Sequence, residues 1–192
     1  MGDVDLVCVP GHGEAVCRVF EGAGFVRGQS PKEHDHDDED TQLYTGPQGV
    51  SCDLHLHMQM FDGLPFDALT EPVALGLVKG VAVRRFEPSA MVAHLTQHFY
   101  GHMDDIGPVL LWVLDFAFVL RKDAARIDPE KVRAILRNDV IYGLFLRILG
   151  LLHQHGEELG PVLTDYARRA PALLLGEVLR QRRLVPWRVP SA

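Results

Sequence analysis

The sequence has few cysteines, no long uninterrupted apolar run and no excess of basic residues. Three cysteines in 192 residues make a poor disulfide framework. The longest apolar run, 109–120, is broken by Asp115 and is shorter than the roughly 20 residues that a membrane-spanning helix needs. The first residues also lack the basic stretch that opens a secretory signal. These absences predict a reduced, cytoplasmic protein with no membrane segment.

The charge balance is acidic, with 19 basic residues against 26 acidic ones and a formal net charge of -7. An acidic chain is a poor binder of a phosphate backbone, so the charge argues against a nucleic-acid partner. Most of the acidic excess lies in one run, 33–40, within a polar segment that has no periodicity. We expect this segment, 28–40, to be a solvated loop that binds metal ions weakly, because ordering it costs entropy.

The two halves of the chain differ in their predicted secondary structure. In the first half, the valine-rich alternation of Asp3–Val9 predicts a strand, and a short amphipathic helix follows it up to Gly22. Segments 41–45 and 50–60 flank the turn sequence GPQG and predict an antiparallel hairpin. A strand at 81–86 then precedes helices that begin near Glu87, Val109, Asp128, Val140, Gly160 and Pro171. We therefore predict an α+β protein, with a small mixed sheet in a domain at 1–86 and an all-helical domain at 87–192.

Three carboxylates stand in this strand context. Asp3 and Asp5 share one face of the first predicted strand, and Asp53 shares the polar face of a later strand with His55 and His57. Carboxylates that converge from adjacent strands suit magnesium or manganese, hard cations that take oxygen ligands and leave positions open for phosphate oxygens. Such an ion can activate an attacking hydroxyl and neutralise phosphate charge. The pattern therefore predicts phosphoryl or nucleotidyl transfer.

The same residues resemble a known superfamily, the polymerase β-like nucleotidyltransferases. Segment 2–7, GDVDLV, and the helix that ends in EGAGF at 21–25 look like the Asp-x-Asp strand and following helix of that superfamily. Segment 50–55, VSCDLH, resembles the v-D-l-H strand of its poorly characterised bacterial nucleotidyltransferase family. His98, Trp112 and Asp115 fall in the order of that family's helical segment, H......l.W..D. The resemblance covers roughly residues 2–122.

This resemblance implies a fold, a reaction and a set of site residues. The sheet would be that of a nucleotidyltransferase, and the protein would move an NMP group from an NTP to an unknown acceptor. Asp3, Asp5 and Asp53 would be the catalytic metal ligands, and Asp53 would also help to activate the acceptor hydroxyl. The residues around these ligands or in the acceptor pocket would be His55, His98, Trp112 and Asp115.

One departure from the superfamily motivates an alternative function. A Gly-Ser signature and a helix, which would supply backbone donors to the nucleotide phosphates, normally precede the Asp-x-Asp strand. This sequence begins at that strand, so the sheet would be a truncated one with an open edge. The alternative is a noncatalytic module that binds a partner protein, as antitoxin-like or scaffold relatives do. The open edge would also suit a homo-oligomer.

A weaker alternative is a metal-dependent hydrolase. Asp53, His55 and His57 match the Asp-x-His-x-His pattern that opens several hydrolase barrels, and period-two spacing would aim both imidazoles at one metal. Such barrels need roughly 250 residues of strand-helix alternation, whereas the rest of this chain predicts mostly helices. For His57 we favour a solvent-side position over a role as a ligand.

Further candidates lie in the predicted helices. His94, His98 and His102 are spaced by helical turns along one face and could hold a transition metal, but we favour a structural role, with His98 bonded to Asp115. Asp115 lies in an apolar helix that we expect to be largely buried, where an unpartnered carboxylate is costly. We therefore expect it to face a partner or a cleft, either in a buried pair or as a base near the acceptor pocket. Cys8 and Cys52 are expected in the core.

Overall fold

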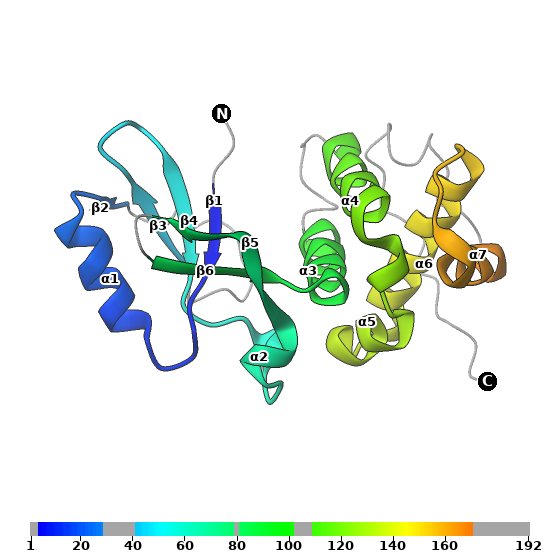
Figure 1. The fold of residues 1–192 in the computed structure, drawn as a ribbon, viewed down its shortest axis with the longest axis horizontal. Coiled ribbons are helices and arrows are strands. Elements are labelled where there is room, and N and C mark those ends of the chain that lie inside the picture. The colour runs from blue at the N-terminus through cyan, green and yellow to red at the C-terminus, as the bar shows by residue number, and fades with distance from the viewer. Residues whose placement is uncertain (1–3, 29–40, 79–80, 102–108, 171–192) are drawn as a thin grey trace. The chain divides into compact units, whose positions relative to one another are not determined.

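The computed structural model describes residues 4–28, 41–78, 81–101 and 109–170, and Figure 1 shows the helices and strands that they form. The chain is mixed α+β, as predicted, with a four-stranded sheet, a two-stranded sheet and a helical C-terminal region. It divides into two compact units, Met1–Phe66 and Asp67–Ala192, which we describe one at a time. The predicted loop at 28–40, apart from Gly28, and the predicted helix from Pro171 fall outside the described ranges.

The first unit is built on a mixed sheet with the strand order β1-β4-β3-β2. Its strands are β1 (Val4–Val7), β2 (Val26–Arg27), β3 (Thr41–Thr45) and β4 (Ser51–His55), and a short 3-10 helix, η1 (Gln59–Phe61), follows. Strands β3 and β4 form the predicted antiparallel hairpin, whose turn needs Gly49 because its φ of 72° lies in the left-handed region. Strand β1 pairs with β4 in parallel. The first and last strands of the unit are therefore neighbours.

Helix α1 (Gly13–Gly22) covers one face of this sheet. Its residues Val16, Cys17 and Phe20 pack against a core of four buried side chains, Cys8, Tyr44, Cys52 and Leu54. The prediction that Cys8 and Cys52 lie in the core is thus confirmed. Because successive side chains of a strand point to opposite faces, the β4 residues that alternate with Cys52 and Leu54 lie on the face away from α1.

The second unit joins a two-stranded sheet to a group of helices. Its elements are α2 (Phe66–Leu69), β5 (Thr70–Val78), β6 (Val81–Phe86), α3 (Pro88–Gly101), α4 (Val109–Asp123), η2 (Ala124–Arg126), α5 (Pro129–Leu136), α6 (Asp139–Gln154) and α7 (Gly160–Arg169). The first residue of α2 belongs to the first unit and the rest to the second. Strand β6 and the helices from α3 to α7 agree with the prediction. Strand β5 was missed, because Pro72 and Gly76 interrupt its pattern and its register with β6 shifts between Pro72 and Leu77.

Polar side chains fix where three of these helices begin. The Glu87 carboxylate accepts the backbone N–H of Ala90 at 2.7 Å, and the Asp128 carboxylate accepts that of Glu130 at 2.9 Å. The Asn138 side chain accepts the backbone N–H of Val140 at 2.9 Å. These bonds satisfy donors that the first helical turn leaves unpaired, which is why the cap residues in the sequence locate the helix starts.

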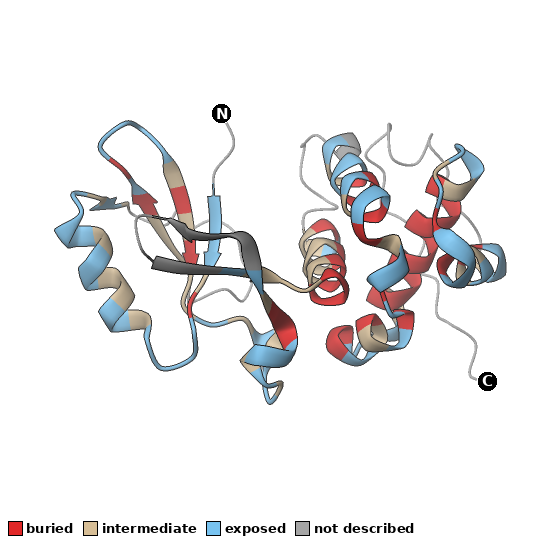
Figure 2. Ribbon diagram, in the orientation of Figure 1, coloured by how far each residue is buried: buried red, intermediate tan, exposed pale blue. Residues whose placement is uncertain are grey.

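Helix α6, and not α4, is the most buried helix of the second unit. Residues 141–152 are all buried, and the visible parts of α6 are red in Figure 2. Helix α4 is half exposed, and its Leu111, Leu114 and Phe118 are 54%, 43% and 65% accessible to solvent. The prediction that 109–121 is a largely buried helix was therefore wrong, because an unbroken apolar stretch does not say which of its faces has a partner.

Across the residues that the structure describes, no helix combines the length and the apolar character needed to cross a membrane.

An ionic network ties strand β5 to the end of helix α4. Glu71 on β5 accepts a hydrogen bond from Arg85 Nε at 2.8 Å and another from Arg126. Arg126 also donates to Asp123 at 2.9 Å. The hairpin of β5 and β6 therefore belongs to the helical unit. The sequence placed the domain boundary after Phe86, whereas the contacts divide the chain after Phe66.

This network makes stability sensitive to acid. The hydrogen bond from Arg126, helped by Arg85 and opposed by burial, holds the pKa of Glu71 below its usual value. A lowered carboxyl pKa contributes stability above the ordinary value of about 4.3, and that contribution is lost as pH falls through the folded-state pKa. We predict that Glu71→Gln lowers the Tm by roughly 2–6 °C at pH 7 and by much less at pH 3, as measured by circular dichroism.

The exposed Glu158 provides the control for this prediction. Glu158→Gln should change the Tm by less than about 1 °C at both pH values, because a solvated carboxylate contributes little. A Tm deficit in Glu71→Gln that is equal at both pH values would contradict the assigned role of the network.

Candidate functional site

The pairing of β1 with β4 brings two of the predicted site residues together. In this parallel ladder, Asp5 and Asp53 are direct partners. Partner residues on neighbouring strands point to the same face of a sheet, so both carboxylates lie on the face opposite to α1. Asp53 is half-buried, and the Asp5 side chain is 47% exposed. One carboxylate is thus held within the sheet while its neighbour reaches solvent.

The third predicted ligand, Asp3, is not among the described residues. The described ranges contain no group of three His, Cys, Asp or Glu side chains that could hold a metal ion. Because the predicted site needs Asp3, its three-carboxylate form stays a prediction, as do the catalytic roles of Asp5 and Asp53.

His55 contacts the exposed carboxylate of this pair. It lies two residues after Asp53 on β4 and therefore on the same face, with its Nε2 atom 3.4 Å from the Asp5 Oδ1 atom. Its other ring nitrogen, Nδ1, lies 2.9 Å from Oγ1 of Thr41. Its side chain is only 11% exposed. His55 therefore bridges the outer strand β1 to strand β3 on the other side of β4.

The sequence analysis did not single out Thr41, although the register of the predicted hairpin indicates its position. In the hairpin, Thr45 is the partner of Ser51, and counting outward from the turn makes Thr41 the partner of His55. A hydroxyl directly opposite an imidazole on the same face is within reach of a hydrogen bond. The hairpin was predicted, so its register alone would have indicated this contact.

His57 does not share the strand face on which it was predicted. Strand β4 ends at His55, so the alternation of Asp53 and His55 does not extend to His57. The His57 side chain is about half exposed, and its Nε2 atom lies 2.6 Å from Oδ1 of Asp62. The described strands also hold a single parallel pair, β1 with β4, and not the parallel succession of a hydrolase barrel.

The predicted helical residues form a separate aromatic cluster in the second unit. The His98 and Trp112 rings pack at 82° to one another with centroids 5.8 Å apart, and the His94 ring lies 6.1 Å from that of His98. Helices α3 and α4 therefore bring His98 and Trp112 together, whereas His102 falls in a stretch that the structure leaves undescribed. This packing is consistent with the structural role that we favoured for His94 and His98.

Asp115 is exposed on α4, so it does not lie in the buried pair that was one of the two environments expected for it. It lies three residues after Trp112 and three before Phe118, among the apolar side chains of the exposed face of α4. Desolvation by this surface raises the pKa of Asp115, and the charge of the nearby His98 lowers it by less. The carboxylate is therefore accessible to a ligand but costly to ionise.

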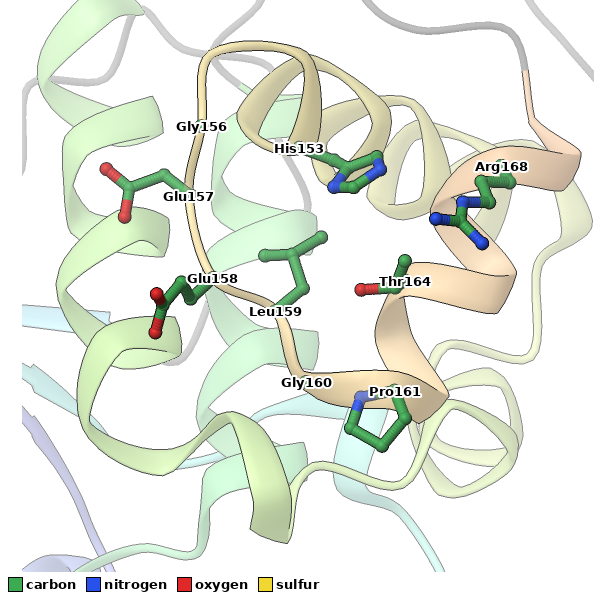
Figure 3. Close-up of a pocket in the computed structure, with 9 residues that line it drawn as sticks. All are labelled: His153, Gly156, Glu157, Glu158, Leu159, Gly160, Pro161, Thr164 and Arg168. Atoms are coloured by element: carbon green, nitrogen blue, oxygen red, sulfur yellow. The ribbon is translucent and has the colours of Figure 1, made fainter.

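A pocket of about 660 Å³ lies elsewhere in the second unit, between the end of α6 and the start of α7 (Figure 3). Its polar lining includes His153, Thr164 and Arg168, together with Glu157, which accepts a hydrogen bond from Arg121 Nε at 2.9 Å. None of the predicted site residues lines this pocket. The pocket and the paired carboxylates are thus formed by different elements.

The three cysteines are free thiols. Burial, with a smaller effect of Cys17, raises the pKa of the Cys8 thiol, which disfavours the reactive thiolate. Cys8 and Cys52 are buried, as expected, whereas Cys17 is half-buried.

Comparison with known proteins yields one match. A family model described as an uncharacterised nucleotidyltransferase matches residues 1–156. Neither a curated protein nor a solved structure matches the chain. The matched range includes the sheet of the first unit and the helices from α3 to α6, and it ends before α7. It therefore contains both paired carboxylates and the aromatic cluster.

The environment of Asp115 gives a test of its ionisation. A raised carboxyl pKa means that stability is fully present below the ordinary value of about 3.9 and declines as pH rises through the folded-state pKa. We therefore predict that Asp115→Asn raises the Tm by about 1–2 °C at pH 7 and leaves it unchanged at pH 3. The increase at pH 7 is small because solvent screens the exposed carboxylate. Thermal unfolding monitored by circular dichroism measures the difference.

Asp165 on α7 is the matched control, because it is an exposed helical carboxylate that pairs with Arg169. Asp165→Asn should give no gain at pH 7, since it removes a favourable partner. An Asp115→Asn variant that is less stable than the parent at pH 7 would show that the carboxylate is stabilised and not desolvated.

Proposed function

Because the chain belongs to the uncharacterised nucleotidyltransferase family, we propose that it transfers a nucleotidyl group from an NTP to an acceptor hydroxyl or similar group in a magnesium-dependent reaction. The observation that carries this proposal is the parallel pairing of β1 with β4, which makes Asp5 and Asp53 neighbours on one face of the sheet. Membership of the wider polymerase β-like superfamily is part of the same proposal.

The donor set fits a hard divalent cation. Asp5 and Asp53 offer carboxylate oxygens from adjacent strands, and Asp3, two residues before Asp5, would add a third carboxylate. Magnesium takes such oxygen ligands and keeps several coordination positions for water or phosphate. Manganese has similar ligand preferences. When bound there, the ion would neutralise phosphate charge and favour deprotonation of the acceptor hydroxyl.

The protein groups have distinct parts in the proposed reaction. Asp53 is half-buried and held between β1 and β3, which suits a base whose position must be fixed. It would accept the proton of the acceptor while the acceptor oxygen forms a bond to the α-phosphorus. The bond from that phosphorus to the bridging oxygen of the β-phosphate would break, and pyrophosphate would leave. Asp5 is more exposed and would help to hold the ion.

The outer face of helix α4 would suit a small ligand that is partly apolar. Asp115 is exposed beside Trp112 and between Leu114 and Phe118, so the outer face of α4 offers one hydrogen-bond acceptor within an apolar and aromatic surface. Such a surface suits a ligand that carries both a hydroxyl or amino group and an apolar part.

Substitution of the paired carboxylates tests the proposal. We predict that the parent protein binds an NTP in a saturable, magnesium-dependent way, and that Asp5→Asn and Asp53→Asn each weaken binding or turnover by more than about 100-fold. This size is expected because substitution of groups that only hydrogen-bond to metal ligands already lowers metal affinity or activity by about 10–100-fold. Titration calorimetry with each NTP, with and without magnesium, measures binding, and release of pyrophosphate measures turnover.

Asp62→Asn is the matched control, because Asp62 is an exposed carboxylate of the first unit that bonds His57 and lies outside the proposed site. It should bind NTPs as the parent does. Retention of full NTP turnover by Asp5→Asn would refute the catalytic assignment. Absence of NTP binding by the parent would instead favour the noncatalytic, partner-binding alternative.

A further inference from the structure

We infer that Thr41 is a positioning residue that acts through His55 to orient the carboxylate of Asp5. The three residues lie on three adjacent strands, β3, β4 and β1. Thr41 is the direct partner of His55, and Asp5 lies two residues before Val7, which is the β1 partner of His55. A continuous row of polar groups therefore crosses the sheet on the face away from α1.

The donors and acceptors in this row assign the position of each proton. A carboxylate only accepts hydrogen bonds, so the His55 Nε2 atom, 3.4 Å from the Asp5 Oδ1 atom, must carry the proton. In a neutral imidazole the other nitrogen, Nδ1, is then an acceptor. The Thr41 hydroxyl, 2.9 Å away, must therefore donate to Nδ1. With the opposite tautomer, the lone pair of Nε2 would face the negative carboxylate.

Burial and side-chain stiffness make Thr41 suited to this role. The His55 side chain is 11% exposed, and Thr41 is half-buried, so water replaces the Thr41 hydroxyl poorly. Threonine is β-branched and has a restricted χ1, which fixes the direction of its hydroxyl. The Asp5 side chain, at 47% exposure, is the most exposed of the three and gains most from a fixed donor. A histidine N–H held by a third group is a common way to fix the orientation of such a partner.

This inference rests on the proposed function, because it assigns Thr41 an effect on a proposed metal ligand. Thr41 itself touches neither metal nor substrate in this scheme. Its effect should therefore appear in the tautomer of His55 and in the affinity of the site, and it should be restored by any side chain that returns the hydroxyl.

The first experiment measures the tautomer without metal or nucleotide. Nitrogen-15 NMR of the imidazole rings, recorded near pH 9 where histidine is neutral, identifies which ring nitrogen is protonated. His55→Gln identifies the His55 signals by their loss. We expect the Nε2–H tautomer in the parent, a mixture of tautomers in Thr41→Val, and the parent state again in Thr41→Ser.

The second experiment measures affinity with Mn²⁺ as the probe. Electron paramagnetic resonance titration should show binding by the parent, about tenfold weaker binding by Thr41→Val, and near-parent binding by Thr41→Ser. Thr45→Val is the matched control, because Thr45 is an exposed threonine on the same strand. It should bind Mn²⁺ as the parent does. Valine matches the shape of threonine and favours strands, so the substitution should preserve the fold.

The outcomes separate the two proposals. A parent protein in the Nδ1–H tautomer, or a Thr41→Val variant with an unchanged tautomer, overturns the inference and leaves the proposed function standing. Parent-like Mn²⁺ affinity in Thr41→Val overturns it as well. A parent protein that binds no Mn²⁺ overturns the proposed function, and the positioning role of Thr41 with it.

Discussion

The parallel pairing of β1 with β4 is the constraint on which the candidate site depends. The register of this pairing makes Asp5 the partner of Asp53. In the same register Val4 is paired with Cys52 and Leu6 with Leu54. A slip of one residue would turn the β1 carboxylate to the α1 face and place apolar side chains beside Asp53. The buried side chains of Cys52 and Leu54, packed under α1, hold β4 in the orientation that makes this register useful.

The sequence predicted much of the first unit because its local signals are strong. The turn sequence located the hairpin, and the alternation around Asp53 identified which β4 residues are buried. The partner of each strand is a long-range property, so the contact between His55 and Asp5 did not follow from the pattern of either strand. Likewise, nothing in the alternation through His57 marked the point at which β4 ends.

In the second unit, helix starts were predictable and burial was not. Asp128 and Asn138 act locally, through backbone donors two and three residues away, so the sequence alone locates α5 and α6. Burial depends on which helices pack together. Helices α4 and α6 are both rich in apolar residues, but α6 is buried along its length and α4 leaves Phe118 exposed. The exposure of Asp115 follows from that difference.

The strand order of the first sheet also has a consequence for how the site forms. Strands β1 and β4 are the first and last of their unit, and α1, β2 and β3 lie between them in the chain. Closing a loop of this length costs entropy before any contact offsets it, whereas the hairpin of β3 and β4 needs only its own turn. We therefore expect the two carboxylates to meet late in folding, after the hairpin has formed. An ion that binds the pair would then slow unfolding more than it speeds folding.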